Sequence, residues 1–369
     1  MSKIIDSADC IVVGGGLIGM LSARLLAMEG LSVILLEQGD LCRESSWAGG
    51  GIISPLVPWE YPDAVTELVR WSQPRYQQLA TDLLDETGIN PQWTQSGLLL
   101  ADYMPHAAID VWREKFPCLL DVLDSGQVQD AEPSINVATG PSLLLPDVAQ
   151  IRNPRLGRAL ARSLAGQGVR VYAQTQVTGL ETQAGSVRGV TTVPGVFAGE
   201  RVVVAGGAWS SRLLENHIPA PCVEPVLGQM IMFEASPGLL RHIVVHDGYY
   251  LIPRRDGLVL AGSTLEHTGF DKHITADAKH MLTGRALALV PGLAGCPVVG
   301  HWSGLRPGSN SGIPLIGAVP ACNGLFVNAG HFRNGVGMAP ASARLLADIV
   351  LGRDSFTRAT AYRPAACGS

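Results

Sequence analysis

The chain has 369 residues, of which 47% are hydrophobic and only 16% are charged. This composition is typical of a folded protein with about two domains, and it excludes a disordered chain. A net charge of −5 without any basic run argues against a nucleic-acid partner. The seven cysteines are scattered without a C-x-x-C pair, so we expect reduced thiols, a cytoplasmic location and no metal site. No uncharged apolar run of about 18 residues occurs, so no membrane helix is predicted.

The first forty residues carry the pattern of a strand, a glycine-rich turn, a helix and a second strand. Residues 10–13 and 32–36 are short apolar runs, and residues 17–29 carry apolar side chains at helical spacing. The turn between the first strand and the helix reads G-G-G-L-I-G over residues 14–19. In this context the glycine spacing predicts a site for an adenine dinucleotide, without deciding between FAD and NAD.

Each glycine of this turn has a specific task at such a site. Gly14 permits the tight turn, Gly16 lets the backbone approach a pyrophosphate, and Gly19 lets the helix pack closely against the strand. The start of the helix offers free N–H groups and a partial positive charge to the phosphates. Glu37 ends the second strand, where it can accept hydrogen bonds from ribose hydroxyls.

The remaining elements follow from hydrophobic periodicity, taken in chain order. A second glycine-rich loop lies within residues 39–58, and its flanking apolar residues do not suit a surface loop. Helical spacing is found at residues 61–87, 153–168 and 277–289, partly at 105–130, and from the loop at 330–337 to residue 351. Strand patterns are found at residues 97–101, 169–172, 175–180, 187–190, 201–205, 248–254, 258–264 and 324–329. From residue 226 the pattern is antiparallel, with a hairpin across residues 255–257.

Three stretches in the second half point to one ligand site: residues 248–254, 301–317 and 330–340. The latter two each place one arginine, Arg306 and Arg333, in a loop bounded by glycine and proline. A lone arginine is most often a surface ion-pair partner. Two arginines in separate glycine-rich loops instead favour binding of a carboxylate, which a guanidinium can hold through two hydrogen bonds.

Several of these motifs together resemble one family of flavoproteins. They are G-G-G-L-I-G, S-S-W-A-G-G-G-I, Y-L-I-P-R, W-S-G-L-R-P and G-H-F-R-N-G, which span nearly the whole chain. The pair W-S-G-L-R-P and G-H-F-R-N-G is the most diagnostic. The set resembles the D-amino-acid oxidase superfamily, and within it most of all the glycine oxidase branch.

The resemblance implies an α/β chain, α+β overall. A Rossmann-like FAD-binding domain would be interleaved with a substrate-binding domain built on an antiparallel sheet. The FAD-binding domain would take residues 1–85, 145–220 and 300–369, and the substrate-binding domain residues 86–144 and 221–299. The cofactor would be noncovalent FAD, because relatives with attached flavin carry a cysteine near residues 304–312 and this chain has none there.

The resemblance also assigns site residues. Arg306 would pair with the substrate carboxylate, Tyr250 would assist through its hydroxyl, and Arg333 would lie close by, so these three are the expected catalytic residues. Val177 would meet the adenine through its backbone. Residues expected along FAD are Gly14, Gly16, Leu17, Ile18, Gly19, Glu37, Gln38, Ser45, Ser46, Gly50, Gly51, Ile52, Val177, His331, Phe332, Arg333, Asn334, Gly335, Val336 and Gly337. No metal ligands are expected.

The implied reaction is oxidative deamination of glycine, sarcosine or a small D-amino acid. A hydride would pass from Cα to flavin N5, dioxygen would give hydrogen peroxide, and the products would be an oxo acid and ammonia or an amine. The imine could feed synthesis of the thiamine thiazole ring. The expected partners are therefore a small amino acid and dioxygen, without nucleic acid or membrane, and a homo-oligomer is expected because relatives often form one.

Two alternatives stay open at this stage. The nearer one is a D-amino-acid dehydrogenase that passes electrons to a quinone at a membrane, although no amphipathic helix with a basic face is found. The other is a flavoprotein that modifies tRNA bases or that binds a ligand without catalysis. The excess of acidic over basic residues disfavours RNA as a partner. If the chain is an oxidase of the glycine oxidase branch, Gly248 and Leu265 leave room for a substrate larger than glycine. Asn153 stands where many relatives carry Asp.

Overall fold

The computed structural model describes residues 3–136, 140–218, 222–320 and 322–364. Its central element is a six-stranded sheet in the order β19-β20-β13-β2-β3-β9, in which only the pairing of β19 with β20 is antiparallel. The strands of this sheet are β2 (Cys10–Val13), β3 (Val33–Leu36), β9 (Arg170–Tyr172), β13 (Arg201–Val204), β19 (Leu315–Ala318) and β20 (Leu325–Ala329). The predicted parallel strands of the dinucleotide motif are thus present.

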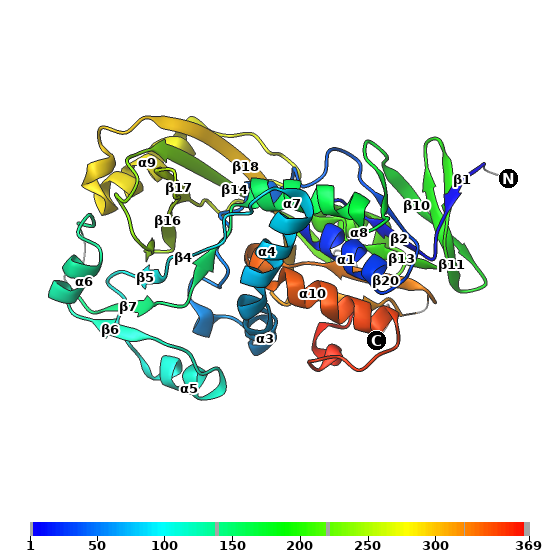
Figure 1. The fold of residues 1–369 in the computed structure, drawn as a ribbon, viewed down its shortest axis with the longest axis horizontal. Helices are drawn as coiled ribbons and strands as arrows, with labels where there is room; N and C mark the ends of the chain where they lie inside the picture. The colour runs from blue at the N-terminus through cyan, green and yellow to red at the C-terminus, as the bar shows by residue number, and fades with distance from the viewer. Residues whose placement is uncertain (1–2, 137–139, 219–221, 321, 365–369) are drawn as a thin grey trace.

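Both faces of the six-stranded sheet are covered, which explains why its strands are continuously apolar. Cys10 and Val12 of β2 belong to a core shared with the helices, whereas Ile11 and Val13 pack toward the opposite face. That face is covered by a four-stranded sheet in the order β1-β12-β11-β10 (Figure 1). Its strands are β1 (Ile4–Ser7), β10 (Val177–Gln183), β11 (Ser186–Thr192) and β12 (Gly195–Ala198).

The helices agree with the periodicity except at one proline. The region predicted as one helix over residues 61–87 is two helices, because Pro74 lies in a short 3-10 turn between them, and proline lacks the N–H that a continuous helix needs. The helices are α1 (Leu17–Met28), α2 (Ser45–Ala48), α3 (Asp63–Ser72), α4 (Tyr76–Thr87), α5 (Ala107–Lys115), α6 (Ser125–Ala131), α7 (Asn153–Gly166), α8 (Ser210–Leu214), α9 (Ala276–Leu289) and α10 (Gly335–Val350).

The other large sheet has eight strands in the order β18-β14-β17-β16-β15-β5-β7-β6. It is antiparallel except for the pair of β15 and β5, and the predicted hairpin is present as β16 and β17. Its strands are β5 (Leu98–Leu100), β6 (Asp121–Leu123), β7 (Ser142–Leu145), β14 (Val223–Glu234), β15 (Ile243–His246), β16 (Tyr249–Pro253), β17 (Leu258–Gly262) and β18 (Val298–Ser309). Two further short strands, β4 (Thr94–Gln95) and β8 (Ala149–Gln150), form an antiparallel pair of their own.

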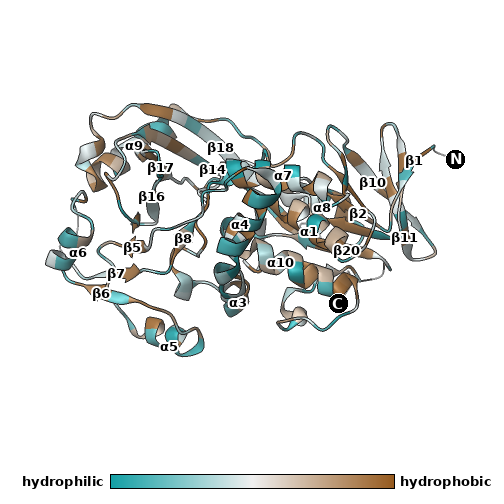
Figure 2. Ribbon diagram, viewed as in Figure 1, coloured by the Kyte–Doolittle hydropathy of each residue, from teal (hydrophilic) through white to brown (hydrophobic). Residues whose placement is uncertain are grey.

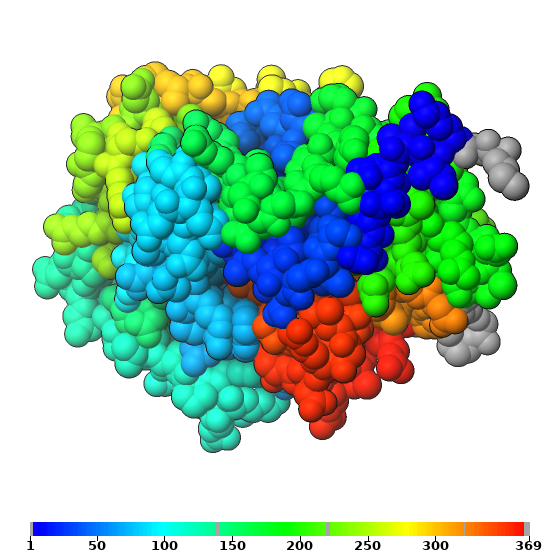
Figure 3. All heavy atoms as spheres, turned by 45° about the vertical axis from the view of Figure 1, so that its right-hand side comes forward, coloured from blue at the N-terminus to red at the C-terminus, as the bar shows by residue number. Residues whose placement is uncertain are grey.

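Segments from the beginning, middle and end of the sequence come together on the side that holds the six-stranded sheet. Figure 3 shows the N-terminal, middle and C-terminal segments side by side on one face, and Figure 2 shows apolar residues on both strands and helices. The predicted α/β class, α+β overall, is therefore confirmed. The division into two domains at the stated boundaries stays a proposal, and β18 crosses the proposed boundary at residue 300.

Candidate active site

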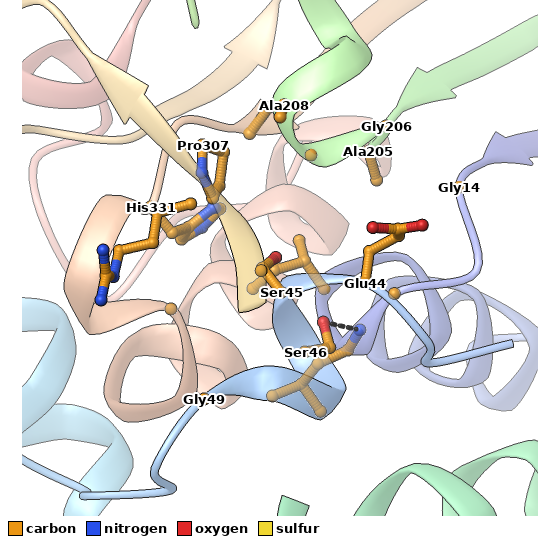
Figure 4. A pocket seen from close by; sticks show the side chains of 18 of the residues that line it. Gly14, Glu44, Ser45, Ser46, Gly49, Ala205, Gly206, Ala208, Pro307 and His331 are labelled. Carbon is orange, nitrogen blue, oxygen red and sulfur yellow. Dashed lines mark hydrogen bonds between the residues drawn. The ribbon is translucent and has the colours of Figure 1, made fainter. Parts of the chain in front are cut away.

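A cavity of about 430 Å³ lies where the carboxyl ends of the parallel strands face the eight-stranded sheet. Val13, Leu36, Ala205 and Ala329 line it, and each stands at or directly after the end of a strand of the six-stranded sheet. Ligands of open α/β sheets bind at this edge. Figure 4 shows the cavity with Gly14 and α2 on one side and His331 on the other.

The glycine-rich turn has the geometry that the sequence predicts. Gly14 has a φ of +115°, and a Cβ there would collide with the backbone of Ala205. A Cβ at Gly19 would collide with the carbonyl of Gly14, so this glycine allows the close approach of α1 to β2. No described residue accepts a hydrogen bond from the N–H of Gly16 or Ile18, so these donors remain available at the start of α1.

Two side chains hold the turn from outside. One Glu37 carboxylate oxygen accepts from the N–H of Gly15 at 2.6 Å, and the other from that of Gly39 at 2.8 Å. The Ser46 hydroxyl accepts from the N–H of Leu17 at 2.9 Å, which Figure 4 marks with a dashed line. A carboxylate has about four acceptor positions, so Glu37 keeps capacity for a ribose hydroxyl.

The second glycine-rich loop, which contains Gly50 and Gly51, packs against the eight-stranded sheet. A Cβ at Gly50 would lie 2.5 Å from Cδ1 of Ile252, and Gly51 has a φ of +76°. The N–H of Ile151 donates to the carbonyl of Gly51 at 2.9 Å, and the guanidinium of Arg254 donates to that of Gly50 at 2.7 Å. These contacts fix the loop, and Gly50 and Gly51 form part of the cavity wall.

The far end of the cavity carries a cation that has no carboxylate partner among the described residues. Arg306 donates to the carbonyls of Leu227 and Thr264, each at 3.2 Å, and to the Ser263 hydroxyl at 2.7 Å. All three acceptors are neutral. Burial lowers the pKa of Arg306, the Tyr250 phenol opposes this shift, and Arg333 adds to it. A partly buried cation in this state is stabilised by an anion.

His331 and Tyr250 complete the wall. The His331 ring is buried with its Nε2 3.0 Å from the Ser342 hydroxyl, and burial lowers its pKa to about 3. It is thus neutral at physiological pH. The Tyr250 hydroxyl lies 3.8 Å from the sulfur of Met230, a weak contact that leaves the phenol able to donate to a ligand.

The structure brings almost all of the predicted site residues to this one cavity. The exceptions are Gly19, which packs α1 against β2, and Gly337, which faces Val69. Sequence reasoning missed further lining residues, which include Glu44, Leu56, Tyr61, Thr175, Gln176, Gly206, Trp209, Arg212, Gly228, Met230, Gly304 and Asn328. Of these, Gly304 lies within the W-S-G-L-R-P motif, and none of the motifs quoted above contains the others.

The fold and cavity define a dinucleotide-dependent oxidoreductase, and comparison with known proteins identifies its family. A family model described as FAD dependent oxidoreductase, abbreviated DAO, matches residues 9–349. The chain therefore belongs to the FAD-dependent oxidoreductase family, and its cofactor is FAD. The uncapped start of α1 and the backbone donors beside it fit the pyrophosphate of this cofactor.

Curated relatives refine this result. The chain is 44% identical over 359 residues to glycine oxidase of Pseudomonas putida, covering 97% of this chain and 98% of that protein. It is 45% identical over 360 residues to glycine oxidase of Pseudomonas aeruginosa, covering 97% and 99%. The bifunctional protein ThiO/ThiG of Trichormus variabilis is 30% identical over 353 residues, which is 94% of this chain and 53% of that protein.

Solved structures agree with these relatives. Glycine oxidase from Geobacillus kaustophilus superposes with a TM-score of 0.92 at 29% identity, covering 98% of this chain and 99% of that one. Iminodiacetate oxidase from Chelativorans sp. shares the fold, with a TM-score of 0.86 at 23% identity and coverage of 96% and 98%. The predicted resemblance and the predicted class, an FAD-dependent amino-acid oxidase, are confirmed at the level of family and relatives. Among the described helices, none has the length and apolarity to cross a membrane.

Proposed function

We propose that this enzyme oxidises glycine, sarcosine or a small D-amino acid, with dioxygen as final electron acceptor and hydrogen peroxide as product. The observation that carries the proposal is the Arg306 guanidinium, which lines the cavity and, within the described part of the chain, is bonded only to neutral oxygens. The carboxylate of an amino acid supplies the missing negative charge. The names of the glycine oxidase relatives support this substrate class.

The surroundings of Arg306 favour a small amino acid. Tyr61, Met230 and Tyr250 line the same cavity, and their side chains are largely apolar. Tyr250 is nearly buried, and its hydroxyl is available to add a second hydrogen bond to the carboxylate. Arg333 lines the cavity as well and reinforces the positive potential.

The wall provides no carboxylate base near Arg306. Of the described lining residues only Glu37 and Glu44 are carboxylates. Glu37 is bonded to the glycine turn, and Glu44 pairs with Lys272 at 3.0 Å. His331 is neutral but bonded to Ser342. We therefore propose that the chain accelerates the reaction by fixing the substrate's orientation, and that the amine enters in its neutral form.

FAD, when bound, supplies the acceptor for the hydride that leaves the substrate's α-carbon. The residues of the chain hold the carboxylate at Arg306 and Tyr250, exclude bulk water with the apolar wall, and present the start of α10 beside His331. Water hydrolyses the released imine to an oxo acid and ammonia, or to an oxo acid and an amine when the substrate nitrogen is substituted. We further propose that the imine serves thiamine thiazole synthesis, in support of which one relative is the bifunctional ThiO/ThiG protein.

The test is a peroxide-coupled assay of the purified FAD-loaded enzyme with glycine, sarcosine, D-alanine and D-proline under air. Peroxide should form in equal amount to the substrate consumed. Substrate consumption that requires an added quinone and yields no peroxide would instead support the dehydrogenase. Arg306→Ala should raise KM about 100-fold, because the partly buried charge pair with the substrate carboxylate is lost. The matched variant Arg353→Ala, which removes an arginine that pairs with Glu29 away from the cavity, should leave KM unchanged.

A further inference from the structure

A second cavity, of about 160 Å³, lies apart from the active site and is lined by arginines. Arg152, Arg241, Arg254 and Arg255 all line it. None of the described residues in its wall is an aspartate or glutamate. Such a concentration of positive charge contrasts with the net charge of −5 on the whole chain. The cavity has room for about five waters, at about 30 Å³ each.

Arg254 is the most deeply placed of these cations. It is 9% exposed and donates to the Gln150 side-chain oxygen at 2.6 Å, to the Ile151 carbonyl at 3.3 Å and to the Gly50 carbonyl at 2.7 Å. Every one of these acceptors is neutral. Burial and the neighbouring Arg152 lower its pKa to about 10, so it remains charged at neutral pH. Its charge is not balanced by a directly bonded carboxylate among the described residues.

The other arginines add charge at the rim. Arg255 donates to the Thr94 hydroxyl at 2.9 Å and to the Trp93 carbonyl at 2.6 Å. Arg241 donates to the Asp130 carbonyl at 3.1 Å, at the end of α6. These acceptors are again uncharged oxygens. Both arginine side chains are exposed, so their remaining donors are within reach of a solute.

Two carboxylates lie beside these four cations. Glu132 is buried and accepts from the backbone N–H of Arg241 at 2.9 Å. Asp256 pairs with Arg152 at 2.5 Å, and Arg152 also donates to the Gln92 side chain at 3.2 Å. Four arginines beside two carboxylates leave about two positive charges in excess at the cavity. Arginine binds phosphate and carboxylate oxygens through paired, charge-assisted hydrogen bonds.

We propose that this arginine cavity is a binding site for a phosphate dianion, either inorganic phosphate or the head of a phosphate monoester. The excess of positive charge favours a dianion over a single carboxylate, and the polar wall offers donors from several directions. The bond from Arg254 to Gly50 connects this site with the loop that lines the active-site cavity. An anion here lowers the cost of burying Arg254 and so stabilises that loop.

The proposal is tested by calorimetric titration of the FAD-saturated enzyme with inorganic phosphate at constant ionic strength. Saturating FAD keeps phosphate away from the pyrophosphate site. We expect one saturable site, and a double variant Arg241→Gln/Arg255→Gln should weaken it at least about tenfold, because two charge-assisted donors are lost. Both side chains are exposed, so the fold should tolerate the change.

The matched control is Arg353→Gln/Arg358→Gln, which removes the same charge from the exposed C-terminal segment. This variant should bind phosphate like the unmodified enzyme. Equal weakening in both variants, or no saturable heat at all, would overturn the proposal, since long-range charge or no site would then explain the data. Titration with glycerol phosphate separates the sources: tighter binding than phosphate identifies a monoester, and weaker binding identifies the free anion. Acetate should bind more weakly than either.

Discussion

The guanidinium of Arg306 occupies the space directly beside the α-carbon of Gly228. The two residues lie on the paired strands β18 and β14, where Arg306 is opposite Val226 and Gly228 is opposite Gly304. A Cβ at position 228 would collide with the terminal atoms of the guanidinium. The position of the only cation that we assign to the substrate carboxylate therefore depends on a glycine that itself has no chemistry.

Gly228→Ala should displace Arg306 while leaving the fold intact. The clash involves the end of a flexible side chain, so the guanidinium can move, but it then leaves its acceptors on Leu227 and Thr264. We expect KM for the amino acid to rise about tenfold or more, with Tm nearly unchanged and FAD retained. Gly284→Ala on α9 makes the same chemical change where nothing lies within 4 Å, and its KM should match that of the unmodified enzyme. Unaltered kinetics in both variants would show that Arg306 does not bind the carboxylate.

Tyr250→Phe should weaken substrate binding without changing the shape of the cavity. The phenol has a weak contact to Met230 and also interacts with the Arg306 guanidinium, which keeps its bonds to Leu227, Thr264 and Ser263 when the hydroxyl is removed. Loss of one hydrogen bond to the carboxylate is worth about 1 kcal/mol, so we expect KM to rise about fivefold. The measurement is steady-state kinetics by peroxide release. A fall in kcat with constant KM would instead place the hydroxyl at the reacting atoms.

Ser46→Ala should loosen FAD by removing an acceptor at the start of α1. The Ser46 hydroxyl accepts from the N–H of Leu17, and its loss costs about 1 kcal/mol, as at other helix starts. We expect the FAD dissociation constant to rise about fivefold, measured by flavin fluorescence. Ser211→Ala removes a comparable acceptor of the Val223 N–H at 2.8 Å, away from the cavity. It should reduce stability and leave FAD affinity unchanged, so a loss of FAD in both variants would indicate general destabilisation.

Local pattern accounts for the parts of this site that lie within one supersecondary unit. The glycine turn, the α1 helix and Glu37 are consecutive in sequence, so spacing alone predicts their arrangement. The break at Pro74 was missed because apolar spacing continues across it. The contact of Arg306 with Gly228, and that of Arg254 with Gly50, depends on which strands pair and in which register. No periodicity within either segment encodes that information, so these relationships appear only in the folded chain.

The buried His331 should make stability depend on pH. Its pKa is about 3 in the folded protein, because burial disfavours the charged ring, and near 6.5 in the unfolded chain. Below pH 6.5 the unfolded chain therefore binds a proton that the folded chain does not. The contribution of neutral His331 to the free energy of unfolding is complete above pH 6.5. It falls as the pH decreases from 6.5 toward 3, where the folded protein also binds the proton.

Between pH 7.5 and 5.5 this difference should cost about 1.4 kcal/mol of unfolding free energy, measured by urea unfolding with saturating FAD. His331→Asn has no proton to bind and should lose that much less stability over the same interval, even if its stability at pH 7.5 is lower. His280→Asn on the exposed side of α9 serves as the control and should keep the dependence of the unmodified protein. A pH dependence that is the same in all three proteins would assign the effect to other groups, because only His331 is buried against Ser342 in the cavity wall.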